Sequence, residues 1–82
     1  MDYTEDEDDF FVAFQADLEK KIGYILYNHS LRIIDLEEKS LLSCFPTEDV
    51  AFDLKLVSNY LIIATGSGAY RYEIDTRDGS IS

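Results

Sequence analysis

Cysteine and histidine are almost missing from this chain of 82 residues. Cys44 is the only cysteine and His29 the only histidine. The sequence therefore excludes an intramolecular disulfide and any metal site built from several cysteines. A small domain without disulfides suits a reducing compartment, so we expect a cytoplasmic protein.

Long apolar runs are missing as well. No segment reaches the roughly 20 apolar residues that a membrane-spanning helix needs. The first nine residues, MDYTEDEDD, are acidic where a signal peptide would be basic and then apolar, so we expect no signal peptide. We expect instead that residues 1–9 form an acidic, flexible tail and that residues 10–82 form a single domain.

Basic residues are few. The chain has 7 Lys and Arg against 17 Asp and Glu, which gives a formal net charge of −10. Such a molecule is repelled by nucleic-acid phosphates, so non-specific binding of DNA or RNA is excluded. The same charge steers the protein toward a basic partner.

What the chain does have is apolar residues at every second position, the pattern of half-buried strands. In residues 50–57, Val50, Phe52, Leu54 and Leu56 are expected on one face. Residues 60–64 are apolar on both faces, which predicts a central strand. Only residues 15–22 could hold a helical turn. Turn residues separate the segments, and the pattern predicts about eight short strands, including residues 10–16, 22–28, 31–36, 41–45, 50–57, 60–64 and 69–75.

The two halves of the chain resemble each other, as units of about residues 12–43 and 50–82. The segment Val-Ala-Phe occurs at residues 12–14 and again at 50–52, and Arg32 aligns with Arg71. Asp35 aligns with Asp75, and the offset drifts from 38 to 40 residues through two single-residue gaps. The order of these matches indicates an internal repeat.

Residues 59–82, NYLIIATGSGAYRYEIDTRDGSIS, resemble the inner strands of a β-propeller blade. The resemblance implies an all-β fold, an antiparallel meander in two blade-like four-stranded units. The Gly-His and Trp-Asp signatures of WD40 blades are absent, and two blades cannot close a ring. The units would therefore pack as a small sandwich, form a partly closed barrel, or complete their sheet by self-association.

The sequence offers no catalytic constellation. His29 lies in a predicted turn, and Cys44 alternates with apolar neighbours, so we expect it to be a small buried hydrophobe. The Gly66-Ser67-Gly68 turn is followed by neither a helix nor a lysine and is not a phosphate loop. Residues 5–9 lack the ligand spacing of a calcium loop. We predict that the protein is not an enzyme and carries no cofactor or metal.

In size, charge and lack of catalytic chemistry the chain resembles the bacterial immunity proteins that neutralise nuclease toxins. This resemblance implies an inhibitor, or antitoxin, that covers the basic nucleic-acid site of its target. Two alternatives stay open: a structural or assembly module whose sheet edges pair with a partner strand or with itself, and a DNA mimic directed at another enzyme. Whether the protein is a monomer or a homo-oligomer is left open.

Carboxylates on strands and tight turns lose less entropy on binding than those on a loose tail, so they are the first candidates for partner contacts. Tyrosines on the same strands are candidate aromatic anchors, although core packing would explain them equally. The predicted partner-binding residues are Glu48, Asp49 and Asp53, then Glu73, Asp75 and Asp78, then Tyr70 and Tyr72, and finally the tail acids Asp6, Asp8 and Asp9.

Overall fold

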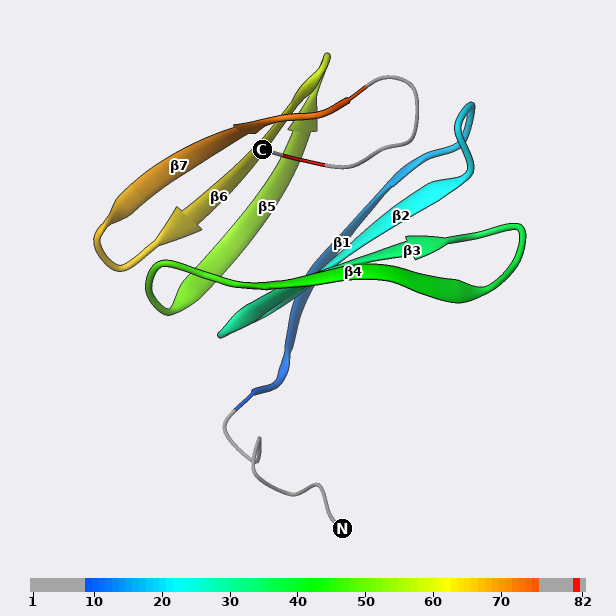
Figure 1. Ribbon diagram of the computed structural model, residues 1–82. Helices are drawn as coiled ribbons and strands as arrows, with labels where there is room; N and C mark the ends of the chain where they lie inside the picture. Colours follow the sequence, from blue (N-terminus) through cyan, green and yellow to red (C-terminus); the bar gives the residue numbers. More distant parts are fainter. Residues whose placement is uncertain (1–8, 76–80, 82) are drawn as a thin grey trace, which may run out of the picture.

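The structure is a computed structural model that describes residues 9–75 and residue 81. These residues form seven antiparallel strands in two sheets (Figure 1). The prediction of an all-β meander is therefore confirmed, and the two sheets do not join into a closed barrel. Within this part of the chain, no helix is long and apolar enough to cross a membrane.

The larger sheet, sheet A, has the order β1-β2-β3-β4, and the smaller sheet, sheet B, has the order β5-β6-β7. Within each sheet, every strand pairs with its neighbour in sequence, because short turns connect them. The strands are β1 (Phe11–Asp17), β2 (Ile22–Tyr27), β3 (Ser30–Asp35), β4 (Ser40–Pro46), β5 (Ala51–Val57), β6 (Tyr60–Thr65) and β7 (Gly68–Glu73).

The expected eighth strand is represented by a single pairing. Ile81 forms an isolated antiparallel bridge with Ile74, just beyond the end of β7. Residues 76–80 and 82 lie outside the described residues. The structure thus gives four strands in sheet A but three in sheet B, with one bridge at the position where the repeat predicts a fourth.

The core lies between the inner faces of the two sheets. Tyr24, Leu26 and Leu61 are fully buried there. The sheets meet along β1 and β5, which lie side by side, and the side-chain amide of Gln15 in β1 donates to the backbone carbonyl of Leu54 in β5 at 3.3 Å. Burial of this apolar layer is the main term that stabilises the fold.

A β-bulge corrects the predicted facing of β5. The pairing with β6 shifts between Ala51 and Asp53, so β5 carries one extra residue there. As a result Ala51 and Leu54 are both buried, whereas Phe52 is 62% exposed. The prediction that Val50 and Phe52 share the buried face with Leu54 is wrong, because strict alternation cannot anticipate a bulge.

Two turns of sheet A share one design. Asp17 before the β1–β2 turn and Asp35 before the β3–β4 turn each accept hydrogen bonds from the backbone N–H groups two and three residues later. Each turn ends on a lysine in the left-handed region, Lys21 (φ 58°) and Lys39 (φ 59°). These aspartate-capped turns explain why residues 15–22 form a hairpin instead of a helical turn.

The units β1–β3 and β5–β7 are built alike. Their strands have 7, 6 and 6 residues in both cases, and each first strand has its bulge next to the end of the second strand. The register makes Val12 equivalent to Phe52, whereas the sequence alignment matches Val12 with Val50. Because the β1–β2 turn is two residues longer than the β5–β6 turn, the structural offset falls from 40 residues in the first strands to 38 in the next two, the reverse of the drift in the sequence alignment.

The two units nevertheless bury opposite faces. In β2 the core residues are Tyr24 and Leu26, and the register equates them with Ile62 and Ala64, on the outer face of β6. The buried residue Ile63 of β6 corresponds instead to Ile25, on the outer face of β2. The units are therefore stacked in one direction, as successive repeats are, and are not related by a face-to-face two-fold axis.

Candidate functional site

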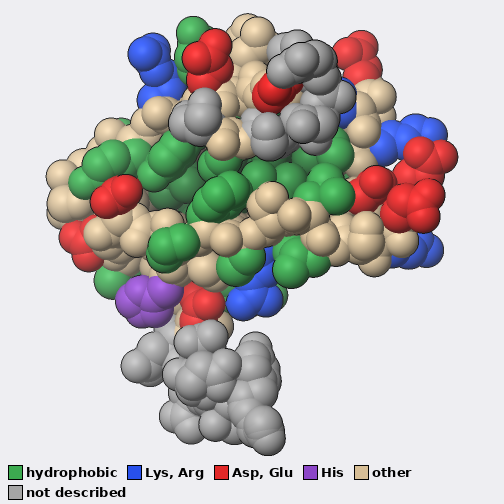
Figure 2. Space-filling model, viewed as in Figure 1, with side chains coloured by type: hydrophobic (Ala, Val, Ile, Leu, Met, Phe, Trp, Pro, Cys, Tyr) green, Lys and Arg blue, Asp and Glu red, His purple; other side chains and the backbone are tan. Residues whose placement is uncertain are grey.

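An apolar groove of about 210 Å³ opens between the two sheets on the side of β4 and β7. Figure 2 shows hydrophobic side chains gathered across this face of the molecule. Strands β3 and β4 provide one wall, and β6 and β7 provide the other. The lining residues are Leu31, Phe45, Pro46, Thr47, Glu48, Ile63, Tyr72 and Ile81.

Glu48 is the one charged side chain among the described residues that line the groove. It lies in the exposed connection between β4 and β5. Burial raises the pKa of Tyr72, and the negative charge of Glu48 raises this pKa further, with a smaller effect from Tyr70. An apolar channel with a carboxylate at its rim can take the stem of a lysine or arginine side chain and pair with its charged head.

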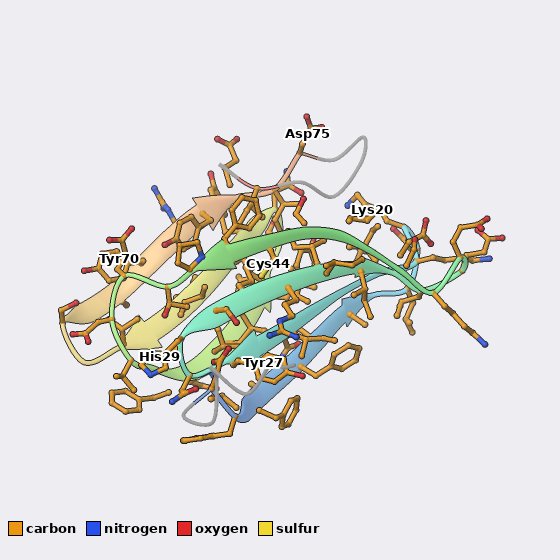
Figure 3. The ribbon with its side chains drawn as sticks, turned by 60° about the horizontal axis from the view of Figure 1, so that its bottom comes forward. Lys20, Tyr27, His29, Cys44, Tyr70 and Asp75 are labelled. Atoms are coloured by element: carbon orange, nitrogen blue, oxygen red, sulfur yellow. The ribbon has the colours of Figure 1, made fainter. Side chains whose placement is uncertain are left out.

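Tyr70 and Tyr72 point to the inner side of sheet B, as the alternation predicts. Tyr70 is opposite Ile63, and Tyr72 is opposite Leu61. The Tyr70 hydroxyl shares a hydrogen bond of 2.9 Å with the Ser67 hydroxyl in the β6–β7 turn (Figure 3). Both side chains are half-buried, and Tyr72 packs against the core and lines the groove.

Asp49 and Asp53 lie close to Glu48 in sequence but face different surroundings. The carboxylate of Asp49 accepts the Val50 backbone N–H at 2.7 Å, and that of Asp53 accepts the Leu54 backbone N–H at 2.9 Å. Both side chains are exposed. Asp49 is in the β4–β5 connection near the groove, whereas Asp53 is on the outer face of sheet B opposite Ala64.

The second predicted group of acids is not gathered with the first. Glu73 is on the outer face of sheet B at the opposite end of the strands, opposite Tyr60. Asp75 follows β7 and is half-buried. The predictions for Asp78, Asp6 and Asp8 lie outside the described residues. The structure therefore brings Glu48 together with Tyr72 and separates Glu73 from them.

Asp9 is part of the fold. Its side chain is only 5% exposed and lies 3.7 Å from the Arg32 guanidinium. It accepts hydrogen bonds from the His29 backbone N–H at 3.0 Å and from the Ser30 hydroxyl at 3.1 Å. These contacts fix the start of β1 against the β2–β3 turn, so this carboxylate has little surface left for a partner.

His29 and Cys44 are both exposed. The expectation that Cys44 is a buried hydrophobe is wrong, because it lies on the outer face of β4 opposite Arg32 (Figure 3). Within residues 9–75 and residue 81, no cluster of three or more His, Cys, Asp or Glu side chains could hold a metal ion.

Sequence reasoning missed the groove itself. Leu31, Phe45 and Ile63 read as ordinary core residues, because each lies on the apolar side of its strand. They become groove walls only because the sheets diverge away from the β1–β5 contact. No local pattern encodes that long-range arrangement.

Comparison with known proteins finds no relative: no family model, no curated protein and no solved structure matches the chain. Only the residues and their geometry therefore indicate a function.

Proposed function

We propose that this protein is an immunity-type inhibitor that binds a basic protein, a nuclease toxin of bacterial origin, and covers its nucleic-acid site. The observation that carries this proposal is Glu48 at the rim of an apolar groove beside Tyr72. A basic side chain of the partner would fill the groove and pair with this carboxylate. The net charge of −10 supports fast, steered association with such a partner.

The neighbouring acids extend the proposed contact. Asp49 lies on the same connection as Glu48, and Asp53 follows on the exposed side of β5. Both carboxylates are already oriented by a backbone N–H, which lowers the entropic cost of engaging a partner. Asp9 is left out of this surface because it is engaged within the fold. We place the encounter in the cytoplasm, where the lone Cys44 stays reduced.

The test begins with the neighbouring genes, where we expect a toxin with a basic C-terminal nuclease domain, and continues with an inhibition assay on that domain; an isolated gene would count against the proposal. We expect stoichiometric inhibition, and we expect the triple variant E48Q/D49N/D53N to bind at least about tenfold more weakly. The matched control is E19Q/E37Q/E38Q, which removes the same charge from exposed turns at the far end of sheet A. Equal loss in both variants would show that only net charge matters, and lack of inhibition by the wild type would overturn the proposal.

A second candidate function is an assembly module that pairs its sheet edge with another strand. It is favoured by the order of the sheets, because β4 and β7 are end strands with no full partner strand among the described residues. Salt separates the two candidates. Binding of a basic partner weakens as salt rises, whereas backbone pairing at an edge hardly responds.

We further propose that the two units arose by duplication of one blade-like β-meander. Their equal strand lengths, shared bulge position and single stacking direction support this origin. Expression of β5–β7 fused to a second copy of itself should give a folded protein if the units are interchangeable, and an unfolded product would count against the idea.

A further inference from the structure

Glu48 lies on a short connection between β4 and β5 that is fastened at both ends to the same turn. At the start of the connection, the Thr47 backbone N–H donates to the His29 carbonyl at 3.0 Å. At its end, the Ala51 backbone N–H donates to the Asn28 carbonyl at 2.8 Å. Asn28 and His29 form the turn between β2 and β3. Two backbone hydrogen bonds therefore join the rim of the groove to this turn.

The connection is also ordered between its two ends. The Thr47 hydroxyl donates to the Asp49 backbone carbonyl at 2.7 Å, and the Asp49 carboxylate accepts the Val50 backbone N–H at 2.7 Å. The Val50 carbonyl in turn accepts the Gly66 backbone N–H at 3.0 Å. Glu48 thus follows and precedes residues that are hydrogen-bonded, and the position of its backbone is set by theirs.

Asn28 fixes the turn against the start of β1. Its backbone N–H donates to the Phe10 carbonyl at 3.0 Å, and its side-chain Oδ1 accepts the Phe10 backbone N–H at 2.8 Å. Asn28 is only 5% exposed, and a buried polar side chain keeps its hydrogen bonds because leaving it unpaired is costly. The side chain of Asn28 therefore determines where the backbone of this turn lies.

Asp9 fastens the same turn a second time. Its carboxylate accepts the His29 backbone N–H at 3.0 Å and the Ser30 hydroxyl at 3.1 Å. The turn is thus tied to the start of β1 by Asp9 and Phe10, and it is tied to the groove rim by two of its own carbonyl groups. Contacts far from the groove in sequence therefore reach the residue at its rim.

We propose that Asn28 is a positioning residue for Glu48, which it holds at the rim of the groove through the hydrogen bonds of the β2–β3 turn. Neither Asn28 nor Asp9 lines the groove, so both act on it only through this turn. The inference rests on the proposed function, in which the Glu48 carboxylate binds a basic side chain of the partner. Asp9 then contributes to partner binding without contacting the partner.

The test uses the ionisation of Tyr72, because the charge of Glu48 raises the pKa of this residue and thereby reports where the carboxylate lies. In an NMR titration of the full chain, Asn28→Ala should lower the pKa of Tyr72, by no more than Glu48→Gln does. Combined with Glu48→Gln, it should cause no further change. The matched control is His29→Ala, which changes an exposed side chain of the same turn, keeps both carbonyl groups and should leave Tyr72 unchanged.

A folded Asn28→Ala variant with an unchanged pKa of Tyr72 would overturn the inference. An equal decrease with and without Glu48→Gln would do the same, because the substitution would then act on the burial of Tyr72 and not on Glu48. Asp9→Ala is the second variant in case Asn28→Ala does not fold, and it should lower the pKa of Tyr72 only when Glu48 is present. The titration needs no partner, so a failure of the proposed function would leave its result unchanged.

Discussion

The outer faces of the two sheets differ far more than their backbones do. On sheet A this face presents Phe11, Phe14 and Leu41, whereas on sheet B it presents Asp53, Lys55 and Glu73. Both units have the same strand lengths and the same bulge. Hairpin geometry and surface chemistry are therefore encoded separately. Turns and bulges set the register, and the residues between them determine which faces can be buried.

The largest effect on stability is expected when an inner side chain of a strand is truncated, compared with an outer side chain of the same strand. Ile63→Ala in β6 should lower the free energy of unfolding by about 2–5 kcal/mol through the cavity it leaves, since Ile63 is 2% exposed. Ile62→Ala, on the outer face of the same strand, should cost less than about 1 kcal/mol. Urea unfolding measures both. Equal costs would mean that the outer face of sheet B is also buried.

A smaller effect on stability is expected when one exposed aromatic ring is removed from each outer face. Phe14→Ala removes a ring that is 45% exposed and covers Gly23, so it should cost about 1–2 kcal/mol. Tyr60→Ala removes the ring stacked under Arg71 on the outer face of sheet B and should cost about 0.5–1 kcal/mol. Thermal unfolding measures both costs. A larger cost for Tyr60→Ala than for Phe14→Ala would contradict this difference between the two outer faces.

The turns of sheet A provide a third test. Asp17→Ala removes the acceptor of two backbone hydrogen bonds and the ion pair with Lys20 at 2.9 Å, and should cost about 0.5–1.5 kcal/mol. Asp35→Ala removes the equivalent hydrogen bonds and is the matched control. The cost at Asp17 should be the larger by a few tenths of a kcal/mol.

The effect of Asp17→Ala on stability should depend on pH. The hydrogen bond from Lys20 lowers the pKa of Asp17 below its ordinary value of 3.8. A lowered pKa means that the folded state favours the carboxylate, so its contribution is full above pH 3.8 and is lost as pH falls through the folded pKa. The difference in the free energy of unfolding between wild type and D17A should therefore shrink as pH falls below 3.8. A constant difference would show that the Lys20 contact is not formed.

The smallest effect concerns the groove. Glu48→Gln should lower the pKa of Tyr72 and leave it above 10.0, because burial is the larger cause of the shift. The raised pKa favours the neutral phenol, so stability from Tyr72 is complete below pH 10.0 and is lost as pH rises through the folded pKa. NMR titration of labelled tyrosines measures this, with Glu73→Gln as a control that should leave Tyr72 unchanged.

Strands and turns could be predicted well from the sequence, because alternation and turn residues are local signals. Residues 60–64 are a central strand as expected, and Tyr70 and Tyr72 share a face. The bulge at Phe52 could not be predicted, since a single extra residue reverses the facing without a distinctive sequence. Exposure of Cys44 has a different cause: it alternates with Phe45, which lies on the inner face, so Cys44 lies on the outer face of sheet A.

The candidate site was harder to predict than the fold. Charge and spacing selected Glu48 and Tyr72, which the structure brings to one groove. They also selected Asp9, which is used to fasten β1 to the β2–β3 turn. A sequence reports that a carboxylate is present but not whether the fold has already engaged it, because that depends on contacts between residues about 20 positions apart.

Because the two units stack in one direction, the two ends of the stack expose different faces. Each unit offers one face to the unit before it and the other to the unit after it, so an added meander meets the same kind of surface as the last. Inserting a third copy ahead of β1 would cover Phe14 and Ile25 with an inward-facing layer of the kind that covers Ile63. The chain is in this sense an extensible scaffold, whose length could be increased by design without changing its individual parts.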